Sequence, residues 1–191
     1  MTIYTEDLCV GGIATASASW SSWVPANAFD NNITTGWHHT SYYPYPAILR
    51  YQFPTARRIK KYTLRTRVGT DNYQCPITWT FEGSNDASNW VVLDSHTNLD
   101  WGSTKYKEFT FENNNYYLYY KLNVTVNYVD DSLSIIEMEM MEEVVQTPKP
   151  LNSIYNVGHR GNLRGKAKQG FIRPTIKEFF TSTNYLPTNK S

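Results

Sequence analysis

The chain has 191 residues, of which 40% are hydrophobic and 15% aromatic, so it can bury one full core and has room for one or two domains. The formal net charge is only +1 at pH 7, so the total charge alone indicates no particular partner. No run of eighteen apolar residues occurs, which excludes a membrane-spanning helix, and we expect no membrane insertion.

The first seven residues do not resemble a secretory signal. They include Glu6 and Asp7, and they lack the basic region and the apolar core that such a signal requires. Because the chain starts with Met1, we expect that it uses no signal peptide.

Residues 26–37 form the most informative polar segment of the chain. Asp30, Asn32 and Thr35 bring carboxylate, amide and hydroxyl oxygens together at short spacing. A hard cation such as Ca²⁺ takes six to eight oxygen ligands of these kinds. The same residue types also dominate ordinary turns, because they hydrogen-bond their own backbone. The residues alone leave both alternatives open.

Strand patterns follow along the chain, whereas helix patterns are scarce. The segments either alternate in character or are rich in β-branched and aromatic residues, and Gly, Asn, Asp and Pro clusters separate them. They are residues 50–53, 61–68, 78–82, 105–111, 120–126 and 136–140. Short strands at this spacing predict an all-β fold, an antiparallel sandwich.

The last strand segment carries two carboxylates on one face. In residues 136–140 the alternation places Met138 and Met140 in the core and turns Glu137 and Glu139 the other way. Carboxylates beside a core need compensation, so we expect at least one of them to have a cation partner.

Five segments, taken in order, resemble one known family. They are residues 46–53, residues 59–64, residues 76–86 closing on Trp90, residues 119–122, and residues 136–140. Together they are similar to the discoidin domain, also called the coagulation factor 5/8 type C domain, which overlaps with carbohydrate-binding module family 32. The similarity covers about residues 13 to 143 and implies a galactose-binding-domain-like jelly-roll β-sandwich.

The resemblance also implies a structural Ca²⁺ site. In this family a Glu of the closing strand completes the site that the first loop makes. The matching positions here are Asp30, Asn32, Thr35 and Glu137. The family usually has Gly after the Asp, whereas this chain has Asn31, which tolerates the left-handed backbone that Gly would serve.

Sugar recognition in this family belongs to the loops at one end of the sandwich, here residues 37–46, 67–74 and 98–104. In galactose-binding members a His after the first-loop Trp, an Arg ending the second strand and an Asn beyond it hold the sugar. His38 or His39, Arg67 and Asn72 fall at those places. Tyr43, Tyr73 or Trp101 could supply the ring on which a sugar stacks.

These residues also have simpler interpretations. His38 and His39 could bind a transition metal or merely lie in a surface loop. The tyrosines of residues 42–45 could cap the core, and Arg67 could pair with Asp71 across a turn. The only two cysteines, Cys9 and Cys75, are expected to be free buried thiols.

The charge of the chain divides sharply near residue 145. Residues 1–145 hold 10 Lys and Arg against 16 Asp and Glu, a balance of −6, whereas residues 146–191 hold 8 against 1, a balance of +7. A Pro-containing stretch, residues 146–150, marks the join and indicates a linker. We therefore predict a sandwich domain over residues 1–145 and a basic extended tail over residues 146–191.

Three interpretations of the tail compete. It could be an arm for nucleic acid, an anchor that becomes ordered on a partner chain, or a solubilising end. The apolar side chains of Phe171, Phe179 and Phe180 follow the basic run and favour the anchor. The expected partners are other structural chains of a multi-copy assembly, and nucleic acid is not expected.

No enzyme motif occurs, since the sequence lacks a nucleophile elbow, a phosphate loop and a zinc-protease helix. We therefore expect no catalysis. The predicted function is a lectin-like glycan-binding module of a larger assembly, such as a bacteriophage tail or capsid protein that attaches to host surface carbohydrate. The alternative is a purely structural decoration protein without sugar binding. Either protein would be located in the virion or outside the cell after release.

Overall fold

The computed structural model describes residues 2–40, 42–67, 74–128 and 132–145. These residues form nine strands and one short 3-10 helix. In chain order they are β1 (Ile13–Ala16), η1 (Pro25–Phe29), β2 (Trp37–Thr40), β3 (Ala47–Arg57), β4 (Ile59–Thr66), β5 (Pro76–Ser84), β6 (Val91–His96), β7 (Tyr106–Thr110), β8 (Tyr117–Asn127) and β9 (Ser132–Glu142). No helix among the described residues is long and apolar enough to cross a membrane.

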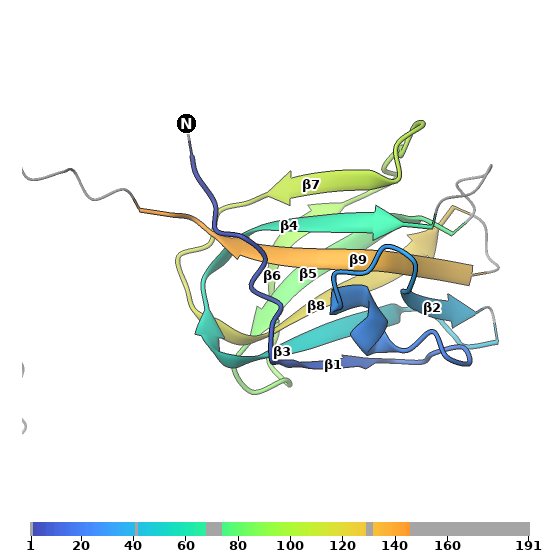
Figure 1. Cartoon of the computed structure of the whole chain (residues 1–191), viewed down its shortest axis with the longest axis horizontal. Coiled ribbons are helices and arrows are strands. Elements are labelled where there is room, and N and C mark those ends of the chain that lie inside the picture. The colour runs from blue at the N-terminus through green and yellow to red at the C-terminus, as the bar shows by residue number, and fades with distance from the viewer. Residues whose placement is uncertain (1, 41, 68–73, 129–131, 146–191) are drawn as a thin grey trace, which may run out of the picture. The chain divides into compact units, whose positions relative to one another are not determined.

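The strands form two antiparallel sheets that face each other (Figure 1). One sheet has the order β1-β3-β8-β5-β6, and the other has the order β2-β9-β4-β7. This confirms the predicted antiparallel β-sandwich. β9, the last strand, lies between β2 and β4. It therefore brings the N-terminal region around β2 close to β4.

Aromatic side chains from both sheets fill the space between them. On β5, Trp79 and Phe81 point inward and are about 1% or less exposed, as the two-residue period of a strand requires. Tyr62 of β4 stacks on Phe81 with 4.4 Å between ring centroids. Its hydroxyl accepts from the Trp79 indole at 2.9 Å and donates to Asp94 at 2.9 Å, so the buried polar atoms of this cluster are satisfied.

The six strand segments predicted from the sequence correspond to β3, β4, β5, β7, β8 and β9. The structure adds β1, β2 and β6. Residues 37–40 were expected to belong to a binding loop, but they form β2, whose four residues are all buried. A strand that is covered on both faces shows no alternation, so its pattern is not visible in the sequence.

Gly36 allows β2 to approach β9 closely. A Cβ atom at this position would lie 2.8 Å from the carbonyl oxygen of Ile135 and 2.9 Å from the Cα of Ile136. These are backbone atoms that cannot move aside independently, so any side chain here would push β2 away from its neighbour.

The N-terminal segment around Thr5 and Leu8 runs beside the C-terminal half of β9 (Figure 1). Its amides at Thr5 and Leu8 donate to the carbonyls of Glu142 and Met140 at 2.9 and 3.0 Å. Cys9 in this segment and Cys75 before β5 are both buried and free, which confirms the prediction for the two thiols. The predicted tail, residues 146–191, lies outside the described residues.

Candidate functional site

A hollow of about 570 Å³ opens at the end of the sandwich where β2, the end of β4 and the start of β9 meet. Aromatic, amide, hydroxyl and cationic side chains line it. They are Trp20, Trp23, His38, Thr40, Tyr42, Arg67, Gln74 and Ser132. We call this hollow the end cleft.

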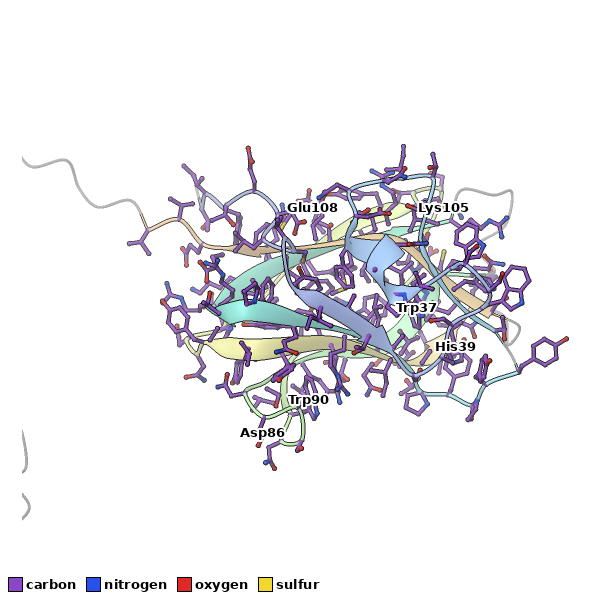
Figure 2. All side chains as sticks on the ribbon, turned by 60° about the horizontal axis from the view of Figure 1, so that its bottom comes forward. Trp37, His39, Asp86, Trp90, Lys105 and Glu108 are labelled. Carbon is purple, nitrogen blue, oxygen red and sulfur yellow. The ribbon has the colours of Figure 1, made fainter. Side chains whose placement is uncertain are left out.

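The strand geometry of β2 decides which of the two adjacent histidines reaches the end cleft. Successive side chains of a strand point to opposite faces, so His38 and Thr40 line the cleft while Trp37 and His39 turn into the sandwich. His39 is 0% exposed, and its ring lies 6.1 Å from that of Trp37 (Figure 2). Of the two histidines, His38 is therefore the one placed to touch a ligand in the cleft.

His38 is held as a neutral hydrogen-bond acceptor. Its Nδ1 lies 2.5 Å from the Oγ of Ser134, and that hydroxyl donates to the Oε1 of Gln74 at 2.8 Å. Because the single hydroxyl hydrogen is used on Gln74, this network assigns the ring proton to Nδ1 and leaves a lone pair on Nε2. Burial lowers the pKa of His38, and the charge of Arg67 and the neighbouring His39 lower it further.

Arg67 follows the last residue of β4 and brings the positive charge of the end cleft. Its guanidinium carbon lies 5.7 Å from the ring centroid of Trp23, which restrains the side chain through a cation–π contact. Arginine presents planar, directional donors, so a group held in this way can bond a hydroxyl or a carboxylate of a ligand.

The two tryptophans belong to a turn that is pinned to β2. The Trp20 amide donates to the His38 carbonyl at 3.0 Å, and the His38 amide donates to the Trp23 carbonyl at 3.3 Å. The ring centroids of Trp20 and Trp23 lie 5.7 and 6.4 Å from that of His38. Trp20 is 50% exposed, so part of its ring is open for stacking. Sequence reasoning missed this turn, although two tryptophans in a Ser-rich segment without periodicity were a usable signal.

The structure does not bring every predicted ligand residue to the end cleft. Trp101 is 2% exposed, and its indole donates to the Pro76 carbonyl at 2.6 Å, so it packs in the core and has no free ring face. Tyr43 is partly exposed but does not line the cleft, whereas its neighbour Tyr42 does. Asn72 and Tyr73 lie outside the described residues, as does Asp71.

The predicted cation loop is a turn held by its own side chains. Asp30 accepts from the Asn32 amide at 3.0 Å with one oxygen and from the Thr35 hydroxyl at 2.8 Å with the other. The Asn32 side-chain oxygen accepts from the amide and the hydroxyl of Thr34. Asn31 has a φ of 57°, the left-handed backbone that a Gly would adopt easily and that Asn tolerates.

Glu137 of β9 faces this loop with a carboxylate that lacks partners. The residue is 5% exposed, and neither of its oxygens has a hydrogen-bond partner. Burial raises the pKa of Glu137 to about 7, and the charge of Asp30 contributes to the rise. The backbone amides of Asn31 and Asn32 moderate this rise in pKa, but neither donates a hydrogen bond to the carboxylate. The Asn32 amide donates to Asp30 instead.

These donors suit a hard, oxygen-seeking cation. Asp30 and Glu137 supply two carboxylates, and the described residues hold no cluster of three or more His, Cys, Asp or Glu side chains that could bind a metal ion. The remaining ligands would come from amide, hydroxyl and backbone carbonyl oxygens of the loop, which is the donor set that Ca²⁺ takes. The orphaned carboxylate of Glu137 is the observation that favours a cation here.

Comparison with known sequences identifies one family. The model of the F5/8 type C domain matches residues 13–138. A comparison with curated protein sequences found no match.

Several solved structures share the fold. The family 32 carbohydrate-binding module of Clostridium perfringens NanJ, in complex with galactose, has a TM-score of 0.64 at 20% identity and covers 73% of this chain and 100% of its own. A second C. perfringens family 32 module, in complex with GalNAc-β-1,3-galactose, has a TM-score of 0.63 at 18% identity, with 71% and 99% covered. Chitosan-binding module 2 from a Paenibacillus sp. IK-5 chitosanase/glucanase, in complex with chitotriose, has a TM-score of 0.61 at 18% identity, with 70% and 98% covered. At these identities the likeness establishes the fold alone.

Proposed function

The chain belongs to the F5/8 type C domain family, and we propose that it is a non-catalytic glycan-binding module whose ligand site is the end cleft. One observation carries the proposal. A neutral acceptor on His38, a cationic donor on Arg67 and the half-exposed ring of Trp20 converge on one hollow. Convergent polar groups beside an aromatic ring are what a sugar-binding site requires.

Each group has a distinct role toward a sugar. The ring of Trp20 stacks on the apolar C–H face, which is the contact that aromatic side chains make with saccharides. Arg67 donates to ring or hydroxyl oxygens, and the Nε2 of His38 accepts from a hydroxyl hydrogen. The proposal also keeps Asn72 as a hydrogen-bonding residue and Tyr73 as a stacking ring, on their positions in the sequence alone, because both lie outside the described residues. Galactose-terminated glycans are the first ligands to test, because two of the solved relatives are complexes with galactose or GalNAc-β-1,3-galactose.

We further propose that Asp30, Asn32, Thr35 and Glu137 hold a structural Ca²⁺. The ion would neutralise the buried carboxylate of Glu137 and tie the first loop to β9. Since η1 leads from the tryptophan turn into this loop, the ion would stiffen the scaffold of the end cleft rather than contact the sugar.

A glycan array followed by titration calorimetry on the full chain tests the sugar proposal. His38→Ala, Arg67→Ala and Trp20→Ala should each weaken binding, and loss of the charged hydrogen bond of Arg67 should cost about 1.5–3 kcal/mol, roughly ten- to hundredfold in Kd. Arg65→Ala is the matched control, because Arg65 lies over the ring of Tyr106 at 5.1 Å and not in the end cleft. Binding that survives all three cleft substitutions would sink the proposal.

We also propose that the module serves a larger assembly, such as a bacteriophage tail or capsid particle attaching to host carbohydrate. The charge division of the chain, −6 over residues 1–145 and +7 over residues 146–191, supports a tail with a separate role as an anchor. Its apolar side chains, Phe171, Phe179 and Phe180, would bury against a partner chain. Deleting the chain from Pro148 onward should leave sugar binding intact and prevent incorporation into the particle. Normal incorporation of the truncated protein would contradict the anchor, and incorporation of the full chain without any glycan binding would favour the decoration protein.

A further inference from the structure

A row of polar side chains crosses the outer face of the five-stranded sheet. Thr15 of β1 pairs with Arg50 of β3, Arg50 pairs with Lys121 of β8, and Lys121 pairs with Glu82 of β5. The residues before and after Arg50, Leu49 and Tyr51, are buried in the core, so Arg50 points away from it. The register therefore sets two cations side by side on this face.

Trp90 folds over both cations. Its ring centroid lies 5.2 Å from the guanidinium carbon of Arg50 and 4.2 Å from the ammonium nitrogen of Lys121. Figure 2 shows Trp90 on the loop with Asp86 that projects from the sandwich. The Asp86 carboxylate accepts from the amides of Ser88 and Asn89 at 2.9 and 2.7 Å, and the Trp90 indole donates to the Ala87 carbonyl at 3.2 Å. The ring is thus held in place before any ligand arrives.

The charges of this row do not balance. The Lys121 ammonium pairs with Glu82 at 3.0 Å, and both side chains are largely buried. The side chain of Arg50 makes no ion pair and no hydrogen bond with any described residue, and its Nε is buried without a partner. A cation that is partly withdrawn from water and has unused directional donors favours a bound anion.

A hollow of about 280 Å³ lies directly against Arg50. Its lining is Thr15, Ala16, Ser17, Ile48 and Arg50. The Ser17 hydroxyl accepts from the Ile48 amide at 3.0 Å, which fixes its oxygen and leaves its hydrogen to donate. The hollow therefore combines a cationic donor, hydroxyls and an apolar side chain in a space of the size of one sugar residue.

We propose that this hollow is a second binding site, which takes an oxoanion of the carboxylate or sulfate class, carried by an acidic sugar residue. The planar guanidinium of Arg50 matches two oxygens of such a group, while the ring of Trp90 restrains it from the side. The hollow shares no lining residue with the end cleft, so the proposal does not rest on the function assigned to that cleft.

The test follows the indole N–H resonance of Trp90 in the ¹⁵N-labelled full chain, assigned with Trp90→Phe, at low ionic strength. The probes are galacturonate, inorganic sulfate and galactose. Galacturonate should shift the resonance saturably, whereas neutral galactose should not. A response to galacturonate well above that to sulfate assigns an acidic sugar, and an equal response assigns the oxoanion itself.

Four variants decide between a ligand site and a purely structural cation. Arg50→Gln should remove the response, and Arg50→Lys, which keeps the charge but not the fork, should weaken it by roughly tenfold. Arg67→Ala, which disables the end cleft, should leave it unchanged. Arg58→Gln is the matched control, because Arg58 lies over a different ring, that of Tyr116, at 5.6 Å. The proposal is overturned if neither anion moves the Trp90 resonance, or if the shift persists in Arg50→Gln.

Discussion

Glu137→Gln should change the way in which stability depends on pH. The folded state raises the pKa of Glu137 from 4.5 to about 7, mainly through burial. Between these two pH values the folded protein binds a proton that the unfolded chain has already released, so stability falls as pH rises through this window and levels off above 7. Gln keeps the size of the side chain and cannot ionise.

The magnitude follows from the shift. A rise of about 2.5 in the pKa of Glu137, at 1.36 kcal/mol per pKa unit, lowers the free energy of unfolding by about 3 kcal/mol at pH 8. This is a large part of the 5–15 kcal/mol that stabilises a typical domain, and it corresponds to roughly 6–12 °C in Tm for a chain of this length.

Urea unfolding at pH 4.5, 6 and 8 in the presence of a chelator measures the effect. From pH 4.5 to pH 8 the difference in unfolding free energy between Glu137→Gln and the wild type should move by about 3 kcal/mol in favour of the variant. The contributions of all other titrating groups cancel in this difference, because both proteins contain them. The control Glu139→Gln removes a carboxylate that accepts from the Thr63 hydroxyl at 3.1 Å and should retain the slope due to Glu137. A difference that is independent of pH would refute the reasoning about Glu137.

The same experiment with Ca²⁺ tests the proposed ion. Calcium should restore the stability of the wild type at pH 8, by about 2.7 kcal/mol when its concentration is a hundred times Kd, and should not do so in Glu137→Gln or Asp30→Ala. If calcium leaves the unfolding of the wild type unchanged, the loop is a turn without an ion.

Four substitutions test how particular residues are packed. His39→Phe should gain stability relative to the wild type as pH falls from 7.5 to 5. Burial lowers the pKa of His39 and its ring nitrogens have no partners, so the unfolded wild type takes up the proton before the folded wild type does. A difference in unfolding free energy that stays constant with pH in urea unfolding would contradict this. Trp101→Ala should cost about 3–5 kcal/mol of unfolding free energy and Trp20→Ala far less, because Trp101 is 2% exposed and Trp20 is 50% exposed. Equal costs for the two substitutions would contradict this difference in burial. Gly36→Ala should cost about 1–3 kcal/mol in the same assay, because its Cβ meets the backbone of β9, and an unchanged midpoint would argue against that close approach.

Strands that are buried on one face were predictable from the sequence. In β5 and β8 the apolar and polar side chains alternate, and Pro or Asn residues lie at or just beyond their ends. β2 was not predictable in this way, because one face of Trp37–Thr40 meets the core and the other lies under the tryptophan turn. Pairing with β9, about a hundred residues further along the chain, decides its conformation.

The prediction of the candidate site was limited because contacts between residues far apart in the sequence decide which side chains reach the cleft. His38 and His39 are equivalent as neighbours in a loop, and only their place in a strand separates the cleft residue from the core residue. Trp101 lies in a polar segment that indicates an exposed loop, yet its indole finds the carbonyl of Pro76 and the ring is buried. By contrast, Arg67 could be placed from the sequence, because it lies near the end of the strand segment predicted over residues 61–68, and in the structure it directly follows β4.

The central claim, a sugar held in the end cleft, is tested most directly by a titration of the ¹⁵N-labelled full chain with galactose, observed at the tryptophan indole N–H resonances. We expect a saturable shift of Trp20 and Trp23, while the buried Trp79 and Trp101 stay in place, and we expect Arg67→Ala to remove the response. If no glycan bound on the array shifts Trp20 or Trp23, or if the shifts survive in Arg67→Ala, the end cleft is not a carbohydrate site.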